Sequence, residues 1–366
     1  MRVLVTGGAG FIGSYIVDLL VEKGYTVRIL DNLEPQVHKT EPDYVNPEAE
    51  FMRGDVTKPE DWARALKGMD AIIHQAAMVG VGQSMYQPVR YLTANTIGTA
   101  LMYEAIIKMK LKPQKIIVAS SMSCYGEGAY RCPEHGKVYP SIRSREQLER
   151  GEWELFCPYC SKEVEPIPTD EEKPQHNLST YALSKYDQER LTMNYGFALK
   201  IPSVALRYFN VYGPRQSLNN PYTGVAAIFS SRIKNNNQPI IYEDGNQSRD
   251  FIYVEDVARA NLLALESDVS GYYNVGTGNP ITIKGVAETL IKLYGKSLEP
   301  KVTGEFRPGD VRHCFADITK IKKELGFKPK VSVEEGFRKL VEWGEKVEAE
   351  DRFEEASKEL KSFMGE

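Results

Sequence analysis

The stretch RVLVTGGAGFIG, residues 2–13, joins a short apolar run to a turn rich in glycine. The apolar run predicts a buried strand, and the amphipathic pattern over residues 13–23 predicts a helix. Gly7 permits a tight turn, Gly10 lets a ligand approach the backbone, and Gly13 allows the helix to pack closely. The glycines therefore stand where a strand turns into a helix, which is the first unit of a doubly wound sheet.

Short apolar runs alternate with helical patterns along the whole chain. We expect strands over residues 2–6, 26–30, 71–74, 115–120, 203–208 and 271–275, and helices over residues 13–23, 59–66 and 95–108. Apolar strands separated by helices are typical of a parallel sheet covered on both faces, with right-handed crossovers. The sequence predicts an α/β fold, a doubly wound parallel sheet of the Rossmann type, with a smaller α/β C-terminal lobe.

The composition of the chain indicates a large globular protein and argues against nucleic-acid and membrane partners. With 366 residues, 42% of them hydrophobic, the chain can bury more than one core. A formal net charge of -4 provides no basic excess, so we expect no nucleic-acid partner. No apolar run approaches the roughly 20 residues that span a bilayer, and no signal sequence precedes the first strand. We therefore expect no membrane partner and a cytoplasmic location.

Asp31 ends the second expected strand, where a carboxylate accepts hydrogen bonds from an adenosine ribose and repels a 2′-phosphate. The amides at the start of the first helix suit a pyrophosphate, so the pattern favours NAD over NADP. Asp55 is expected at the adenine, with capping of its own loop as the alternative. The residues expected around NAD on these grounds are Gly7, Gly10, Phe11, Ile12, Gly13, Asp31, Asn32, Asp55, Val56, Ala76, Ala77 and Ser120.

Tyr181 and Lys185 stand four residues apart in an expected helix over residues 181–199, hence on one helix face. A free phenol has a pKa of about 10, which a neighbouring ammonium and a positively charged nicotinamide both lower. Ser121 ends a central parallel strand, at the edge where ligands bind, so its hydroxyl can bridge a substrate oxygen to Tyr181. We predict that these three residues are catalytic at a substrate carbinol and that Tyr181 and Lys185 also contact the cofactor.

Several motifs, taken in order, resemble those of extended short-chain dehydrogenases that act on nucleotide sugars. They are TGGAGFIG at residues 6–13, Asp31, Ser121 before Cys124-Tyr125-Gly126, Tyr181 with Lys185, and Arg207-Tyr208-Phe209-Asn210. The resemblance runs from Met1 to about Gly344 and extends through residues 245–256 and 307–310. It implies a dTDP- or UDP-sugar as the substrate and a homodimer formed by the helices over residues 95–108 and 181–199.

The same resemblance implies further site residues. Asn95 and Tyr208 are expected to line the cofactor, and Asn210 to touch the sugar diphosphate. Arg249 and Arg307 are expected to bind phosphates, with Asp310 of the second arginine's motif also at the substrate. Guanidinium groups suit phosphate oxygens, although a surface salt bridge is the alternative for either arginine.

The chain departs from the family pattern just after Ser121. Family dehydratases and decarboxylases carry acidic residues there, whereas this chain has Met122-Ser123. Without an acid, oxidation followed by re-reduction on the opposite face is the chemistry that remains. Ser123 is expected near the substrate, with a strand-end cap as the alternative. Val79 replaces a lysine found in galactose-type epimerases, so details of their sugar pocket do not transfer.

The motif set is most similar to that of the nucleotide-sugar 4-epimerases. Because this chain also carries a long insertion, it most resembles the 4-epimerases that act on dTDP-L-rhamnose. Epimerases of UDP-glucose or UDP-N-acetylglucosamine are the alternative. Dehydratases and decarboxylases are a further alternative, and would change the mass of the sugar. A dinucleotide-sensing protein without chemistry is the alternative from a different class.

Four potential metal ligands lie in a stretch rich in proline and charge. Cys132-Pro133-Glu134-His135 and Cys157-Pro158-Tyr159-Cys160 supply three thiolates and one imidazole, which suits tetrahedral zinc. Because all four ligands come from protein, we predict structural zinc, bound by Cys132, His135, Cys157 and Cys160. Free cysteines in a loop are the alternative, and Cys124 and Cys314 are expected to be buried and unpaired.

These patterns divide the chain into four parts. We expect an NAD-binding Rossmann domain over residues 1–126, 167–211 and 249–279, and an inserted zinc knuckle over residues 127–166. A nucleotide-sugar-binding lobe is expected over residues 212–248 and 280–343. Residues 344–366 are highly charged with apolar residues at helical spacing, which predicts a solvated C-terminal helix.

Overall fold

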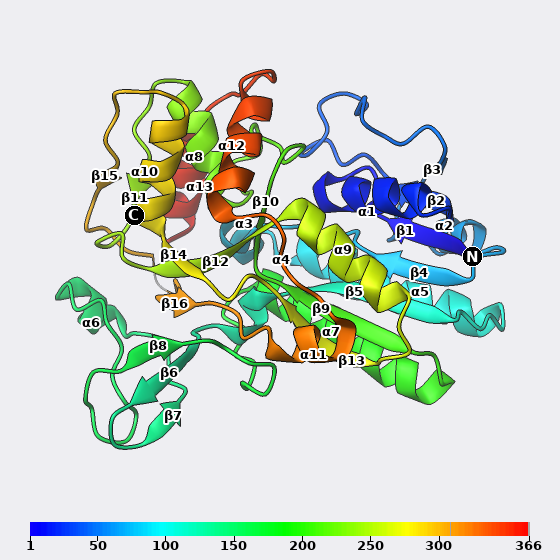
Figure 1. The fold of residues 1–366 in the computed structure, drawn as a ribbon, viewed down its shortest axis with the longest axis horizontal. Helices are drawn as coiled ribbons and strands as arrows, with labels where there is room; N and C mark the ends of the chain where they lie inside the picture. Colours follow the sequence, from blue (N-terminus) through cyan, green and yellow to red (C-terminus); the bar gives the residue numbers. More distant parts are fainter. Residues whose placement is uncertain (308, 365–366) are drawn as a thin grey trace.

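A seven-stranded parallel sheet forms the centre of the molecule (Figure 1). The computed structural model describes residues 1–307 and 309–364; Pro308, Gly365 and Glu366, which belong to two of the expected parts, lie outside the described residues. The sheet has the order β13-β9-β5-β4-β1-β2-β3, and all its neighbouring strands are parallel. The strands are β1 (Arg2–Thr6), β2 (Thr26–Asp31), β3 (Glu50–Arg53), β4 (Ala71–His74), β5 (Lys115–Ser121), β9 (Ser203–Tyr208) and β13 (Gly271–Val275). The expected α/β class is confirmed, and each expected strand lies within one residue of its bounds.

Helices cover both faces of this sheet, because successive side chains of a strand point to opposite sides. Val3 and Val5 pack toward the first face and Leu4 toward the second. On the first face lie α1 (Phe11–Glu22), α9 (Val254–Leu265) and α11 (Thr319–Leu325). On the second lie α2 (Pro59–Ala65), α5 (Gly98–Lys108) and α7 (Thr180–Leu199). β1, β4, β5 and β9 are therefore buried on both sides, which explains their largely apolar character, whereas the edge strand β3 is mostly exposed.

The helix expected over residues 95–108 begins earlier than predicted and in a different form. The chain passes through α3 (Val81–Tyr86) and α4 (Pro88–Tyr91) into a π-helical turn, η1 (Leu92–Ile97), and only then into α5. A π-helical turn widens the helix locally and is frequent at functional sites. Apolar periodicity does not distinguish such a turn from an ordinary helix, so the sequence did not reveal it.

The second lobe is built on a smaller mixed sheet. β10 (Asn210–Tyr212) and β16 (His313–Cys314) pair in parallel with β12 (Ser248–Tyr253), and β14 (Pro280–Thr282) pairs with β12 in the antiparallel sense. A separate parallel pair joins β11 (Ile240–Ile241) to β15 (Lys301–Val302). Against these strands pack α8 (Val225–Lys234), α10 (Ile283–Leu293) and α12 (Val333–Gly344), in a core where Tyr212, Phe251 and Phe337 are in mutual ring contact.

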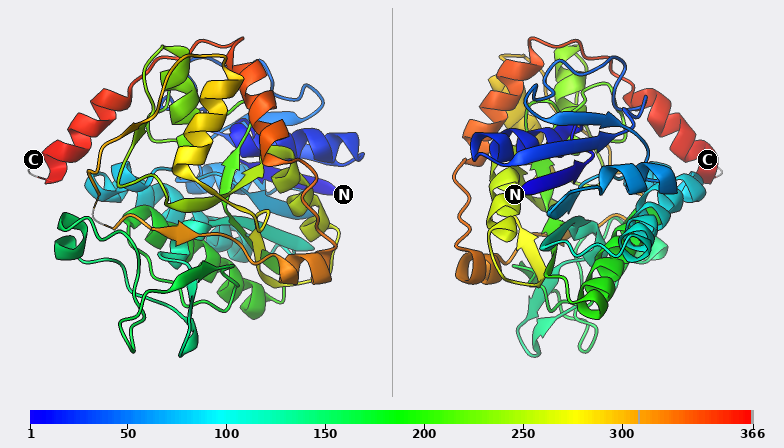
Figure 2. Two further views of the ribbon diagram at one scale, coloured as in Figure 1. Left: turned by 60° about the vertical axis from the view of Figure 1, so that its left-hand side comes forward. Right: turned by 90° about the vertical axis from the view of Figure 1, so that its right-hand side faces the viewer.

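The insertion forms a small sheet of its own. After β5 and a short 3₁₀-helix, η2 (Met122–Tyr125), the chain makes an antiparallel sheet of β7 (Gly136–Val138), β6 (Ala129–Cys132) and β8 (Glu165–Ile167). The connection before β8 carries α6 (Arg145–Glu149). Figures 1 and 2 show this unit protruding below β14 and β16 of the second lobe. Its apolar core is limited to Tyr130, Cys132, Val138, Leu155, Cys157 and Val164.

The charged C-terminal segment forms a helix, α13 (Phe353–Met364), whose described side chains are exposed or half-buried. It lies on the outside of the molecule (Figure 2). The ring of Phe363 lies 6.0 Å from that of Tyr86 in α3, and the Glu359 carboxylate accepts hydrogen bonds from Tyr86 and Tyr222. Among residues 1–307 and 309–364, none of the helices combines the length and the apolarity that a bilayer crossing demands.

Candidate active site

The glycine-rich turn after β1 leaves space that any side chain would fill. Gly7 has φ of 68°, and a Cβ at this position would lie 2.8 Å from the amide nitrogen of Ala76. A Cβ at Gly13 would lie 2.0 Å from the carbonyl oxygen of Gly7. Gly10 begins α1 with extended backbone, and none of the described side chains caps this helix end. The free amides of the first turn therefore fit the pyrophosphate of a dinucleotide.

Asp31 is held at the end of β2 by two backbone amides. Its Oδ2 accepts a hydrogen bond from Ala9 N at 3.0 Å and its Oδ1 accepts one from Leu33 N at 2.9 Å. Each carboxylate oxygen keeps a second lone pair for a ribose hydroxyl. The side chain is buried yet lines the cavity, which suits the ribose of NAD.

Asp55 caps its own loop and also lines the cavity. Its Oδ1 caps the loop by accepting hydrogen bonds from Thr57 N and Thr57 Oγ1, both at 2.8 Å, and its Oδ2 accepts one from Asn32 at 3.1 Å. Burial raises the pKa of the Asp55 carboxyl, but the hydrogen bonds from Thr57 and Asn32 lower it overall. The residue also lines the cavity beside Val56, so it caps the loop and remains available to a ligand.

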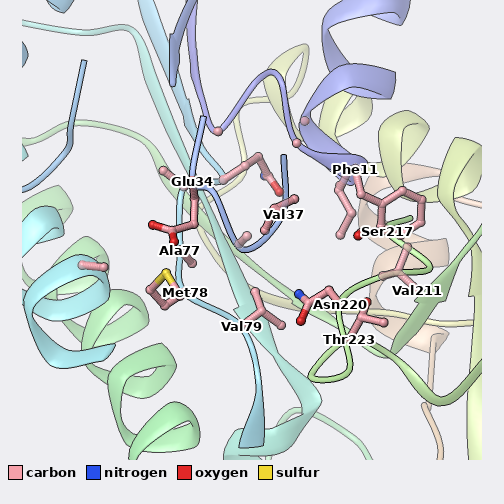
Figure 3. A pocket seen from close by; sticks show the side chains of 18 of the residues that line it. Phe11, Glu34, Val37, Ala77, Met78, Val79, Val211, Ser217, Asn220 and Thr223 are labelled. Atoms are coloured by element: carbon pink, nitrogen blue, oxygen red, sulfur yellow. The ribbon is translucent and has the colours of Figure 1, made fainter. Parts of the chain in front are cut away.

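A single cavity of about 630 Å³ runs from the glycine turn to the second lobe. In Figure 3, Ala77, Met78 and Val79 lie across it from Phe11 and Val211. The structure brings together at this cavity the expected residues Gly7, Gly10, Phe11, Ile12, Gly13, Asp31, Asn32, Asp55, Val56, Ala76, Ala77, Ser120, Ser121, Tyr181, Lys185, Tyr208 and Asn210.

The sequence did not reveal the residues that close the cavity on the side of the second lobe. Gln216, Ser217, Asn220 and Thr223 lie on the loop between β10 and α8 and line this side. The side-chain oxygens of Asn210 and Gln216 are buried and have no hydrogen-bond partner within the described residues. Buried polar atoms without partners are costly, so these two oxygens suit the hydroxyl or amide groups of a ligand.

Tyr181 and Lys185 lie one turn apart on α7, as expected. Ser179 caps this helix through the amide of Ala182, and the amide of Tyr181 donates to Ser84 Oγ at 3.0 Å. Lys185 Nζ donates to the carbonyl oxygen of Ala119 and to Gln188 Oε1, both at 2.9 Å. Both side chains line the cavity, so the phenol and the ammonium reach the same ligand space.

The pKa values of this pair differ from the simple expectation. Burial raises the pKa of Tyr181 to about 12, against the opposing effect of a hydrogen bond with Ser121. Burial also lowers the pKa of Lys185 to about 8. In the chain alone, desolvation therefore outweighs the expected effect of Lys185 on the phenol. The positive charge of an oxidised nicotinamide would favour the phenolate.

Ser120 and Ser121 both line the cavity, whereas Ser123 does not. Ser121 Oγ accepts hydrogen bonds from Ser123 N at 3.1 Å and from Ser123 Oγ at 2.9 Å. Ser123, expected at the substrate, lies outside the cavity lining and belongs to the cap of η2. Ser120 Oγ donates to Glu189 at 2.7 Å, within a buried cluster with Arg207.

Asn95, expected to line the cofactor, lies beneath the cavity wall instead. Its Oδ1 accepts a hydrogen bond from Met78 N at 2.7 Å, and its Nδ2 donates to Met78 O at 3.0 Å and to Ser184 Oγ at 2.8 Å. The side chain is fully buried and is absent from the lining. Through these hydrogen bonds Asn95 fixes the backbone of Met78, which lines the cavity, and its contact with the cofactor stays a prediction.

The two arginines expected at the phosphates do not line the cavity. Arg249 donates to the carbonyl oxygens of Ser248 at 2.8 Å and Arg312 at 3.0 Å, so backbone occupies its guanidinium. Arg307 pairs with Asp310 at 2.8 Å and lies 4.6 Å from the ring centroid of Tyr242. The structure thus shows local partners for Arg249, Arg307 and Asp310, and their role at the substrate stays a prediction.

The four expected metal ligands come together in the insertion. The Sγ atoms of Cys132 and Cys160 lie 3.6 Å apart, and His135 Nδ1 lies 3.5 Å from Cys132 Sγ and 3.6 Å from Cys157 Sγ. All four ligand atoms lie within 4.8 Å of one another. Zinc bonds of about 2.0–2.3 Å in a tetrahedron require ligand atoms about 3.5–3.8 Å apart, so the donor set fits zinc.

Known proteins resemble this chain along nearly its whole length. The model of the NAD dependent epimerase/dehydratase family matches residues 3–147, and that of GDP-mannose 4,6 dehydratase matches residues 162–340. A dTDP-L-rhamnose 4-epimerase of Burkholderia thailandensis is 37% identical over 352 residues, which cover 93% of this chain and 94% of that protein.

Solved structures agree with these sequence matches. The UDP-glucose 4-epimerase of Thermotoga maritima, solved with UDP-glucose, has a TM-score of 0.78 and 34% identity, covering 94% of this chain and 99% of that chain. The UDP-glucose 4-epimerase of Thermus thermophilus, solved with NAD, has a TM-score of 0.75 and 33% identity, with the same coverage of both chains.

Proposed function

Because the chain belongs to the NAD-dependent epimerase/dehydratase family and is an NAD-dependent nucleotide-sugar 4-epimerase, we propose that its substrate is dTDP-L-rhamnose. The similarity to the Burkholderia dTDP-L-rhamnose 4-epimerase over 93% of the chain supports this choice. A putative UDP-glucose 4-epimerase of Methanocaldococcus jannaschii is 36% identical over the same share of the chain. A UDP-sugar is therefore the alternative substrate.

The distribution of acids around the cavity is the observation that supports epimerisation over the related eliminations. Tyr181 and Ser121 meet at one end, and the residues that follow Ser121 are Met122 and Ser123. The carboxylates in the described lining are Asp31, which ends β2, and Glu34 and Asp55, which follow β2 and β3. A dehydratase or decarboxylase needs an acid near the catalytic hydroxyl, and none of the lining acids belongs to that strand end.

Each catalytic side chain then has one task. NAD, when bound, supplies the oxidation of carbon 4 and its re-reduction. Tyr181 accepts the proton of the 4-hydroxyl group and later returns it, with Ser121 aligning the oxygen. Lys185 stabilises the phenolate as a fixed cation. The keto sugar rotates between the two steps, so the configuration at carbon 4 is inverted while the mass stays the same.

A panel of nucleotide sugars tests this proposal. Purified enzyme is incubated with dTDP-L-rhamnose, UDP-glucose, UDP-N-acetylglucosamine and GDP-mannose, and each product is analysed by NMR and mass spectrometry. We expect inversion of the ring proton at carbon 4 of dTDP-L-rhamnose without a change in mass. Loss of water or carbon dioxide would point to a family dehydratase or decarboxylase, and no turnover of any sugar would favour a dinucleotide-sensing protein.

We also propose that the insertion holds one structural zinc ion through Cys132, His135, Cys157 and Cys160. The small apolar core of the insertion and the gathering of the four ligand atoms within 4.8 Å of one another support this role. Because four protein ligands fill the coordination sphere, zinc has no open position for substrate. Metal analysis should find one zinc per chain, and chelation should increase the protease sensitivity of residues 127–166.

A homodimer through the π-helical turn, α5 and α7 is a further proposal. These helices expose Ile97, Ile107 and Phe197, with 50%, 47% and 90% of their surfaces accessible, and exposed apolar side chains on neighbouring helices favour an interface. Light scattering on protein eluted from a size-exclusion column should give twice the chain mass.

We retain as proposals the division of the chain given above, with NAD bound by the large sheet and the sugar by the second lobe.

A further inference from the structure

We propose that the metal-held insertion fixes the position of residues 309–313 in the second lobe, and thereby sets the affinity for the nucleotide sugar. This segment leads into β16, of which His313 is the first residue, and it carries partners of both arginines expected at the phosphates. The claim about its position needs only the contacts described below. The claim about affinity rests on the proposed function.

Arg143 is the first anchor between the insertion and the second lobe. Its guanidinium donates to both carboxylate oxygens of Glu243, at 2.8 and 2.9 Å, and to the carbonyl oxygen of Asp310 at 3.0 Å. The side chains of Arg143 and Glu243 are 1% and 2% exposed. Such a buried pair is stable only while both partners stay in place, so it links the insertion firmly to the loop after β11.

Glu154 is the second anchor, and it lies three residues before the metal ligand Cys157. Its Oε1 accepts a hydrogen bond from Arg312 Nε at 3.0 Å, and its Oε2 lies 3.2 Å from His313 Nε2. Arg312 is fully buried and also pairs with Asp244 at 2.6 Å. A single carboxylate of the insertion thus holds two consecutive residues of the second lobe.

If the insertion moves away from the second lobe, the remaining charges predict that residues 309–313 become more mobile while the lobe stays folded. Arg143 and Glu154 would leave together, one cation with one anion, while Glu127 at the start of the insertion would still accept hydrogen bonds from the amides of Arg312 at 2.9 Å and His313 at 2.8 Å. Arg312 would keep Glu243, at 3.1 Å, and Asp244 as partners. The lobe would therefore retain its fold, because its own apolar core contains no residue of the insertion.

Greater mobility of residues 309–313 would also affect the two arginines that are expected at the substrate phosphates. Asp310 holds Arg307, and the carbonyl oxygen of Arg312 holds Arg249. The cofactor side is independent of this chain of contacts, because none of the insertion residues 127–166 lines the cavity. We therefore expect metal occupancy to change substrate binding while leaving NAD retention and proton transfer unchanged.

The test compares holoenzyme, chelator-treated enzyme, Cys157→Ser and Arg143→Ala. Arg150→Ala is the matched control, because Arg150 lies in the same insertion but, among the described residues, forms its ion pair with the exposed Glu152. Hydrogen exchange reports the mobility of residues 309–313, and calorimetry with dTDP and UDP reports binding. Zinc and NAD contents are measured for every sample.

In chelator-treated enzyme, Cys157→Ser and Arg143→Ala we expect faster hydrogen exchange at residues 309–313 and about tenfold weaker nucleotide binding than in the holoenzyme. We expect no change in Arg150→Ala. Arg143→Ala should keep its zinc, which separates loss of the anchor from unfolding of the knuckle. Unchanged exchange after loss of zinc, or equal behaviour of Arg143→Ala and Arg150→Ala, would overturn the proposal, as would a purified protein without metal. Faster exchange in a protein whose holoenzyme binds neither nucleotide would instead refute the proposed substrate class and leave the coupling intact.

Discussion

Replacing Gln188 with leucine should shift the pH dependence of catalysis in a predictable direction. Lys185 has only two acceptors in the described structure, the carbonyl oxygen of Ala119 and Gln188 Oε1. Burial lowers the pKa of its ammonium to about 8, which corresponds to about 3 kcal/mol against the charged form. A hydrogen bond to a charged group contributes about 1.5–3 kcal/mol, so loss of the Gln188 amide should lower that pKa further.

The direction of the pH shift follows from the protonation state of Lys185 that catalysis requires. Lys185 supports the phenolate only as a cation, and the cation exists below its pKa. Activity of the unaltered enzyme should therefore fall as the pH rises through about 8. In Gln188→Leu this fall should begin about one to two pH units lower, giving a roughly tenfold loss at pH 7.5 that is largely regained near pH 6.

Initial rates over the range from about pH 5.5 to pH 9.5, analysed as kcat/KM, measure this shift. Gln188→Glu provides a control of opposite sign, because a carboxylate beside Lys185 stabilises the ammonium and should move the fall to higher pH. NAD content is measured in each variant to show that the cofactor site is intact. A profile that does not move, or that moves in the same direction in both variants, would show that the charge of Lys185 does not govern the reaction.

Three further predictions address the cofactor, the proton transfer and the stability of the sheet. Tyr181→Phe should lower kcat by about 10²- to 10⁴-fold with NAD content unchanged, measured by NMR of the product; near-normal turnover would exclude the phenol as the base. Asp31→Ala should weaken NAD binding and reduce discrimination against NADP, as judged by chromatography of the released cofactor, and unaltered discrimination would contradict the ribose contact. Arg207→Met leaves the buried Glu189 carboxylate without its guanidinium, which lies 2.6 Å away, and should lower the free energy of unfolding by about 3–5 kcal/mol in urea titrations. Adding Glu189→Leu should recover part of that loss, whereas additive losses would mean that the two charges are not coupled.

Local patterns of the sequence predicted which residues meet at the cavity around the glycine turn and α7. The glycines at positions 7, 10 and 13 and the carboxylate of Asp31 act within one strand-turn-helix unit and the strand beside it, so their spacing carries their geometry. The same holds for Tyr181 and Lys185, because a helix fixes the relation between residues four apart. The paired ligand spacings in the insertion similarly indicated one compact cluster.

The substrate side was less predictable because it depends on contacts between distant segments. Gln216 and Asn220 reach the cavity only through the path of the loop between β10 and α8, for which the sequence has no periodic signal. Asn95 fits the family pattern, yet the π-helical turn directs its amide toward Met78. The local partners of Arg249 were not foreseen because they are backbone carbonyls, which have no signature in the sequence.

The position of β13 has a consequence for synthesis of the chain. β13 pairs with β9, so residues 271–275 supply the partner of residues 203–208 and the last strand of the large sheet. A ribosome must therefore translate residues 209–270, which include the first part of the second lobe, before the edge of β9 is covered. During that interval the growing chain presents an unpaired strand, which is a site for intermolecular association. Fragments that stop near residue 212 should aggregate, and expression at reduced translation speed should increase the demand for chaperones.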